Sequence, residues 1–142
     1  MRSKLPGLVV SVGMLLAAGP VVAHHAFSAE FDANKPIKLK GTVTRVEFIN
    51  PHSWIHVDVK GPDGKLTNWM VEGGAPTGLF RRGITKEDLA VGTELVIDGF
   101  QAKDDSKRVN GRDVTLADGK RLFLGSSGTG APADGRDPTE KK

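Results

Sequence analysis

The sequence of 142 residues contains no cysteine. This absence excludes disulfide bonds, cysteine nucleophiles, thiolate metal sites, iron–sulfur clusters and covalently attached c-type haem. The stability of the fold must therefore come from packing alone.

Long apolar runs are also missing, except close to the amino terminus. There Arg2 and Lys4 precede an apolar stretch at residues 8–18, and residues 21–23 supply a small-residue cleavage site. The stretch is shorter than the roughly 20 residues of a membrane-spanning helix. We therefore expect a Sec-type signal peptide over residues 1–23, a periplasmic or secreted protein, and no stable membrane insertion after cleavage.

The sequence has no strong excess of positive charge once this signal peptide is removed. Of the 20 basic residues, Arg2 and Lys4 lie in the signal, so 18 basic residues face 17 acidic ones. A nucleic-acid-binding protein concentrates Lys and Arg on one face, whereas here the two signs are interleaved along the chain. We therefore expect no nucleic-acid partner.

The local motifs of common enzyme classes are absent as well. No serine stands in a strand–turn–helix nucleophile elbow, and no phosphate-cradling loop precedes a Lys and a Ser or Thr. We therefore expect a binding protein rather than an enzyme. A small copper oxidase is the remaining enzymatic alternative, but it would need a broad substrate platform for which this chain has little length.

What the chain does contain is a series of short alternating apolar patterns separated by turn residues. We expect strands near residues 37–48, 55–59, 66–72, 93–100, 109–116 and 120–124. The apolar phase slips between Val43 and Val46, which predicts a bulge that curls the first strand. Short helical segments are expected at residues 76–83 and 86–90.

This order predicts an all-β fold with a short helical linker, namely a small OB-like antiparallel β-barrel of five to six strands. A different open barrel or a β-sandwich is the main alternative. We expect the barrel over residues 37–125, after an N-terminal arm over residues 24–36 whose Phe27 and Phe31 dock onto it. Residues 126–142 are rich in Gly, Ser, Pro and charge, which predicts a disordered tail.

The histidines are the most distinctive chemical feature of the mature chain. Cleavage after residue 23 would make His24 the amino-terminal residue, whose α-amine (pKa near 7.7) and imidazole can chelate one ion. Such an all-nitrogen site favours Cu(II). The third ligand would be His25 or His52, because His52 follows Pro51 in a turn at the barrel rim that the arm can reach.

His56 is a weaker candidate, since four residues of extended chain separate it from His52 by about 13 Å. We expect it to face solvent beside Asp58 and to stay hydrated. The alternative for all these histidines is structural: a polar start to the mature chain and a turn residue bonded to backbone.

Arg81 and Arg82 form a second candidate site, suited to a carboxylate or phosphate. Trp54 is a candidate for contact with a partner or a sugar. The alternatives are a solvated basic surface and ordinary packing of the indole.

Several motifs occur in order along nearly all of the mature chain up to about Gly125: His24-His25-Ala26-Phe27 with Glu30-Phe31-Asp32, Gly41-Thr42-Val43, Asn50-Pro51-His52, residues 78–83 with Arg81-Arg82, and Val114-Thr115-Leu116-Ala117-Asp118-Gly119. In these motifs the chain resembles an uncharacterised family of small exported bacterial proteins, domain of unknown function 6152. The resemblance implies no activity. It does imply that His24, His25, His52, Arg81 and Arg82 occupy motif positions and that His56 does not.

These features predict an exported periplasmic binding or accessory protein that holds copper, or another divalent metal, at His24, His25 and His52. The alternative is a metal-free interaction module. In that case Arg81, Arg82 and Trp54 would dock on an exported protein partner or an anionic ligand.

Overall fold

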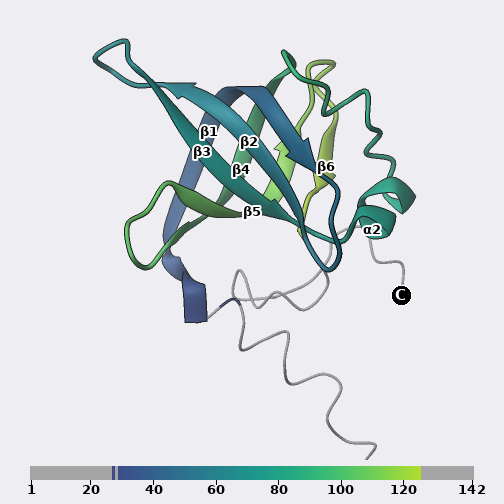
Figure 1. The fold of residues 1–142 in the computed structure, drawn as a ribbon, viewed down its shortest axis with the longest axis horizontal. Coiled ribbons are helices and arrows are strands. Elements are labelled where there is room, and N and C mark those ends of the chain that lie inside the picture. The colour runs from purple at the N-terminus through teal and green to yellow at the C-terminus, as the bar shows by residue number, and fades with distance from the viewer. Residues whose placement is uncertain (1–26, 28, 126–142) are drawn as a thin grey trace, which may run out of the picture.

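The computed structural model describes residue 27 and residues 29–125. The strands and the helix α2 follow one another in the order β1 (Phe31–Glu47), β2 (Ser53–Lys60), β3 (Leu66–Gly73), α2 (Pro76–Arg81), β4 (Glu94–Ala102), β5 (Arg108–Thr115) and β6 (Arg121–Phe123). All of these strands belong to one strongly curved sheet (Figure 1).

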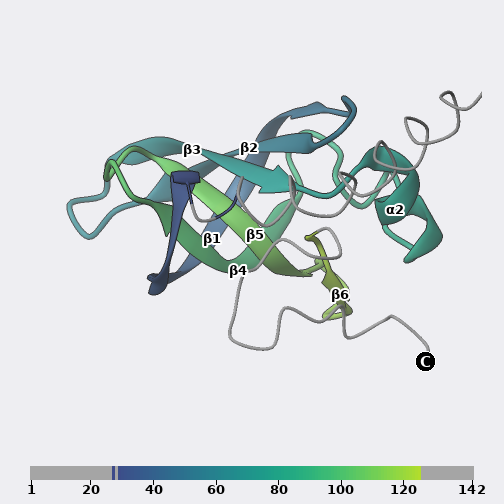
Figure 2. The same cartoon turned by 90° about the horizontal axis from the view of Figure 1, so that it is seen from below.

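The sheet closes on itself. Its strand order is β3-β2-β1-β4-β5-β6, and β3 pairs in addition with β5. The β3–β5 pairing is parallel, whereas the other pairings are antiparallel. Strands β1 to β5 therefore form a ring, with β6 added beside β5 (Figure 2). This arrangement confirms the predicted all-β, OB-like small barrel with a helical linker between β3 and β4.

The long strand β1 makes the closure possible, because it pairs with β4 through its first part and with β2 through its last part. Gly41 and Thr42 pair with both neighbours. The register with β2 shifts between Val43 and Arg45, where the phase slip predicted a bulge. A bulge bends a strand and increases its twist, which is what a ring of so few strands requires.

The core lies inside this ring and is built from the alternate residues that face inward. Ile55 and Val57 of β2 and Val71 of β3 have no exposed surface. Leu79 of α2 and Leu89 belong to the same core cluster, so the linker between β3 and β4 also contributes to it. Burying each such side chain stabilises the fold by about 1.5–3 kcal/mol.

Part of the predicted N-terminal arm, residues 24–36, is already strand, because β1 begins at Phe31. The rings of Phe27 and Phe31 stack with centroids 5.9 Å apart, and Phe27 meets Phe100 edge-on, also at 5.9 Å. These side chains form a second, smaller apolar cluster together with Ala102. The expected docking of both aromatics is therefore confirmed.

The segment between α2 and β4 differs from prediction, because residues 86–90 form a hydrogen-bonded turn rather than a helical segment. The capping bonds themselves are present. The Thr85 amide donates to Asp88 Oδ2 at 2.8 Å, and the Asp88 amide donates to Thr85 Oγ1 at 3.1 Å. Gly92, at φ 91°, lies in a separate turn that follows, in which the Thr93 amide donates to the Ala90 carbonyl oxygen at 3.1 Å.

In the part of the chain that the structure describes, no helix combines the length and the apolar character needed to cross a membrane.

Candidate functional site

The imidazole of His52 stands at the start of β2, directly after a cis Asn50–Pro51 peptide bond. Its Nδ1 lies 2.8 Å from Oε1 of Glu72, a residue near the end of β3. About a third of the His52 side chain is exposed, at 34%, whereas only 11% of the Glu72 side chain is. A neutral imidazole that donates from Nδ1 keeps its lone pair on Nε2, so the solvent-accessible ring retains one metal-binding nitrogen.

Strand register explains why Glu72 is available to His52. Ser53 pairs with Gly73, and Trp54 pairs with Glu72. Because Ile55 and Val71 point into the core, Trp54 and Glu72 point to the outer face of the barrel. The side chain of His52, in the turn before β2, therefore reaches the carboxylate across this outer face.

The environment of Glu72 is unusual for a surface carboxylate. Burial, together with the smaller effect of the nearby carboxylate of Glu30, raises the pKa of Glu72 to about 7 against the opposing effect of Arg108. Arg108 Nη1 is paired with Glu30 Oε2 at 3.0 Å. The guanidinium also lies over the ring of Phe31 at 6.0 Å. The residues that begin β1 thus lie beside the His52–Glu72 pair.

A buried polar group without a hydrogen-bond partner lies next to this pair. Asn110 of β5 is the register neighbour of Glu72 and is only 4% exposed. Its Oδ1 accepts no hydrogen bond from any described residue. Buried acceptors are normally satisfied, so the structure leaves one hydrogen-bonding atom next to this pair that a water or another polar group can fill.

His24 and His25 fall outside the described residues, and their role as ligands stays a prediction. Phe27, two residues after His25, belongs to the aromatic cluster on Phe100. No group of three or more His, Cys, Asp or Glu side chains suited to a metal occurs among the described residues.

His56 is separated from His52, as predicted, but the expectation that it stays hydrated is wrong. Only 13% of its side chain is exposed, and its Nε2 lies 3.0 Å from Oε1 of Glu47. This hydrogen bond is the main reason that the pKa of Glu47 lies below its ordinary value. Its register neighbours Arg45 and Met70 flank it on the outer face, so facing outward does not leave the ring open to water.

The arginine pair at the end of α2 divides into two environments. Arg82 Nη1 donates to the carbonyl oxygen of Gly125 at 2.8 Å, and its guanidinium lies over the ring of Phe123 at 4.9 Å. Arg81 is exposed in the last turn of the helix. Trp54 is half-buried and stands between Glu47 and Glu72 in the strand register.

Sequence reasoning identified His52 but missed Glu72 and Asn110. The alternation of the apolar residues Trp69 and Val71 along β3 does place residue 72 on the outer face of the barrel. The parallel neighbour Asn110, however, comes from a strand far away in the chain, and no local pattern indicates that β3 and β5 pair.

Comparison with known proteins gives one match. The model of a family of unknown function, DUF6152, matches residues 12–111. No curated protein and no solved structure matches the chain. Since the matched region is well over half of the sequence and contains β1 to β4 and most of the site, the chain belongs to the family of unknown function DUF6152.

Proposed function

We propose that this chain is an exported accessory protein that binds one Cu(II) ion through His52 and the histidines at the mature amino terminus, His24 and His25. The function would be capture and delivery of the metal rather than turnover of a substrate.

The observation that carries this proposal is the contact between Nδ1 of His52 and the carboxylate of Glu72 at 2.8 Å. Metal-binding histidines almost always donate their second ring nitrogen to a carboxylate, a backbone carbonyl or a water. Such a contact fixes the tautomer and makes the opposite nitrogen more basic. Here it prepares Nε2 of a partly exposed ring for a metal.

The residues just ahead of β1 support the same assignment, because Glu30 interacts electrostatically with Glu72. Glu30 is close enough to Glu72 to raise its pKa, and Phe27 is held in the aromatic cluster on the same face.

The chemistry of the ligand set favours copper. An amino-terminal histidine offers an α-amine and an imidazole, and His52 offers a second imidazole. Among common divalent ions, Cu(II) binds such nitrogen ligands most tightly. The absence of cysteine from the sequence leaves no thiolate to compete for the ion.

Copper titration of the protein that begins at His24 tests the proposal. We expect one Cu(II) per chain, and an affinity that falls about tenfold or more when the α-amine is acetylated or when His52 is changed to Ala. His56→Ala is the matched control, because its ring is bonded to Glu47, and it should leave the affinity unchanged.

Two results would overturn the copper assignment. One is an affinity that survives both acetylation and His52→Ala, and the other is equal loss in His56→Ala and His52→Ala. In the first case the metal-free interaction module, with the exposed Arg81 on α2, becomes the better account. The intact mass of the exported protein provides a separate check, since a mature chain that begins elsewhere than residue 24 removes the chelating amine.

A further inference from the structure

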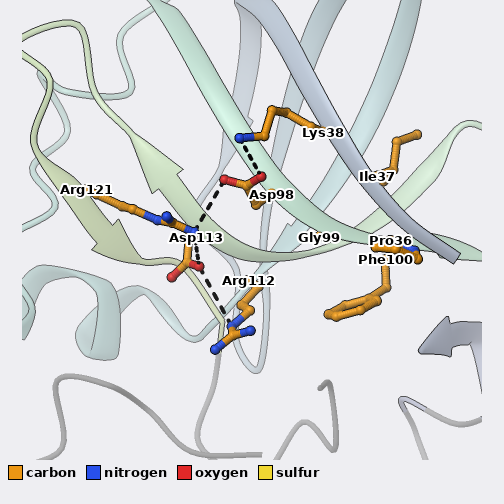
Figure 3. Close-up of a pocket in the computed structure, with 9 residues that line it drawn as sticks. All are labelled: Pro36, Ile37, Lys38, Asp98, Gly99, Phe100, Arg112, Asp113 and Arg121. Carbon is orange, nitrogen blue, oxygen red and sulfur yellow. Dashed lines mark hydrogen bonds and ion pairs between the residues drawn. The ribbon is translucent and has the colours of Figure 1, made fainter. Parts of the chain in front are cut away.

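A second site lies on the outer face of the barrel where β1, β4, β5 and β6 meet (Figure 3). It is an open pocket of about 410 Å³, a volume typical of small-molecule sites. Charged side chains from all four strands line it: Lys38, Asp98, Arg112, Asp113 and Arg121. None of these residues contributes to the proposed copper site.

The charges of the pocket do not balance. Lys38 Nζ lies 3.1 Å from Asp98 Oδ1, and Arg121 Nη2 lies 2.8 Å from Asp113 Oδ2. These two pairs use both carboxylates at close range. Arg112 is the third cation, and its Nε is 3.7 Å from Asp113 Oδ2, beyond hydrogen-bonding distance. One positive charge is therefore in excess, and it is centred on Arg112.

The Nε of Arg112 is also a buried donor without a hydrogen-bond partner among the described residues. Buried donors are rarely left unpaired, because their desolvation is then uncompensated. The planar guanidinium presents its donors as a fork that matches a carboxylate. An added carboxylate would neutralise the excess charge by binding the exposed part of the guanidinium, since 32% of the Arg112 side chain is exposed.

The remaining wall of the pocket is formed by Pro36, Ile37, Gly99 and Phe100. The Ile37 side chain packs against the core, so Pro36 and the edge of Phe100 supply the apolar surface of this wall. In Figure 3 the Phe100 ring and the Arg112 guanidinium project on the same side of the sheet. Phe100 is only 8% exposed because Phe27 packs against it, so a molecule held by Arg112 would extend its body over the exposed Pro36 and contact only the edge of the Phe100 ring.

We propose that this pocket binds a small monocarboxylic acid with an apolar chain or ring, its carboxylate on Arg112 and its body against Phe100 and Pro36. A single negative charge matches the single excess positive charge. A doubly charged phosphate is a poorer fit, because Asp98 and Asp113 would face it from the wall of the pocket.

Titration with benzoate, followed by backbone amide NMR, tests the proposal on the unaltered protein. We expect saturable shifts concentrated at residues 36–38, 98–100 and 111–113. Benzamide, which has the same ring without the charge, should bind roughly ten- to a hundredfold more weakly, because it lacks the charge-assisted hydrogen bonds. Inorganic phosphate should not displace benzoate.

Arg112→Gln should reduce benzoate affinity roughly ten- to a hundredfold, as the loss of the ligand's charge does. Arg81→Gln is the matched control and should leave benzoate affinity unchanged. Loss of binding in Arg81→Gln but not in Arg112→Gln would move the anion site to α2 and overturn the proposal. Equal binding of benzamide, or shifts outside the pocket, would also overturn it. These last two readouts need no variant, so the test remains decisive even if Arg112→Gln fails to fold.

Discussion

At the scale of single residues, the pairing of His52 with Glu72 determines what the candidate site can bind. The carboxylate is mostly buried, at 11% exposure, and holds the ring from its Nδ1 side. The imidazole of His56 makes the equivalent contact with Glu47, but through Nε2 and with only 13% of its side chain exposed. Both residues are histidines, so the greater exposure of the His52 ring is what makes it the candidate ligand.

Glu72→Gln should therefore weaken Cu(II) binding by about ten- to a hundredfold although Glu72 is not itself a proposed ligand. The amide can still accept a hydrogen bond from Nδ1, but it lacks the charge that Glu72 carries above its pKa of about 7 and that makes Nε2 a better donor to the metal. Competition titration against a copper indicator measures the change. Glu47→Gln is the control, and a loss of the same size there would contradict an orienting role for Glu72.

Gly99 is the second residue whose identity the structure explains. A Cβ built at this position would lie 2.3 Å from the carbonyl oxygen of Asn110 and 2.7 Å from Cγ1 of Val109. The strands β4 and β5 approach so closely here that only hydrogen fits. Any side chain at this position would have to push the backbones of β4 and β5 apart.

Gly99→Ala should lower the free energy of unfolding by about 1–3 kcal/mol, the usual range for overpacking a tight interior. Gly78→Ala makes the same change inside α2, where the nearest atom would be 3.6 Å away. It should stabilise the protein by up to about 1 kcal/mol through helix propensity. Urea unfolding of both variants measures the contrast, and two changes of the same sign would show that the close approach at Gly99 is not limiting.

At the scale of elements, β1 shows where local pattern succeeds and where it fails. The phase slip near Val43 correctly predicted the bulge, because neighbouring residues in the sequence show directly that the apolar side of the strand changes. The start of the strand was missed because Pro36 resembles a boundary. In the structure Pro36 is tolerated beside a register irregularity between Phe31 and Pro36, where the ladder with β4 is already interrupted.

The first part of β1 is held to the barrel by its aromatic cluster, so Phe31→Ala should release it. Phe31 is 2% exposed, and loss of such a side chain costs about 3–5 kcal/mol. Amide hydrogen exchange should accelerate over residues 31–36 and at the end of β4. Phe80→Ala, at a ring that is 40% exposed, should cost less than half as much, and equal effects would contradict the anchoring role of Phe31.

At the scale of the whole molecule, sequence patterns predicted a barrel but not which two strands close it. Alternation predicted most strands and their order predicted the barrel, whereas the parallel β3–β5 pairing joins segments with no local relation. The same limit applies to the candidate site. His52 is visible from its turn, whereas Glu72 and Asn110 become its neighbours only through strand register and ring closure.

The carboxyl-terminal boundary of the folded unit can be tested with two truncations. Leu122, Phe123 and Leu124 are at least 91% buried, and Arg82 is bonded to the carbonyl of Gly125. Removal of residues 122–142 should therefore abolish cooperative thermal unfolding, since it removes several kcal/mol from a total of roughly 5–15 kcal/mol.

Removal of residues 126–142 alone should leave the melting temperature unchanged, as expected for a tail outside the barrel. Circular dichroism during heating compares the two forms with the full chain. A large drop in the melting temperature of the shorter deletion would show that the predicted tail contributes to the fold.

The central claim is that His52 and the amino-terminal histidine bind the same copper ion. NMR of the protein that begins at His24, with ¹⁵N-labelled histidine rings, measures this directly, because Cu(II) broadens the signals of the rings that it binds. Substoichiometric Cu(II) should broaden the His24 and His52 ring signals together and spare His56. Broadening of His24 while His52 stays sharp would contradict the claim.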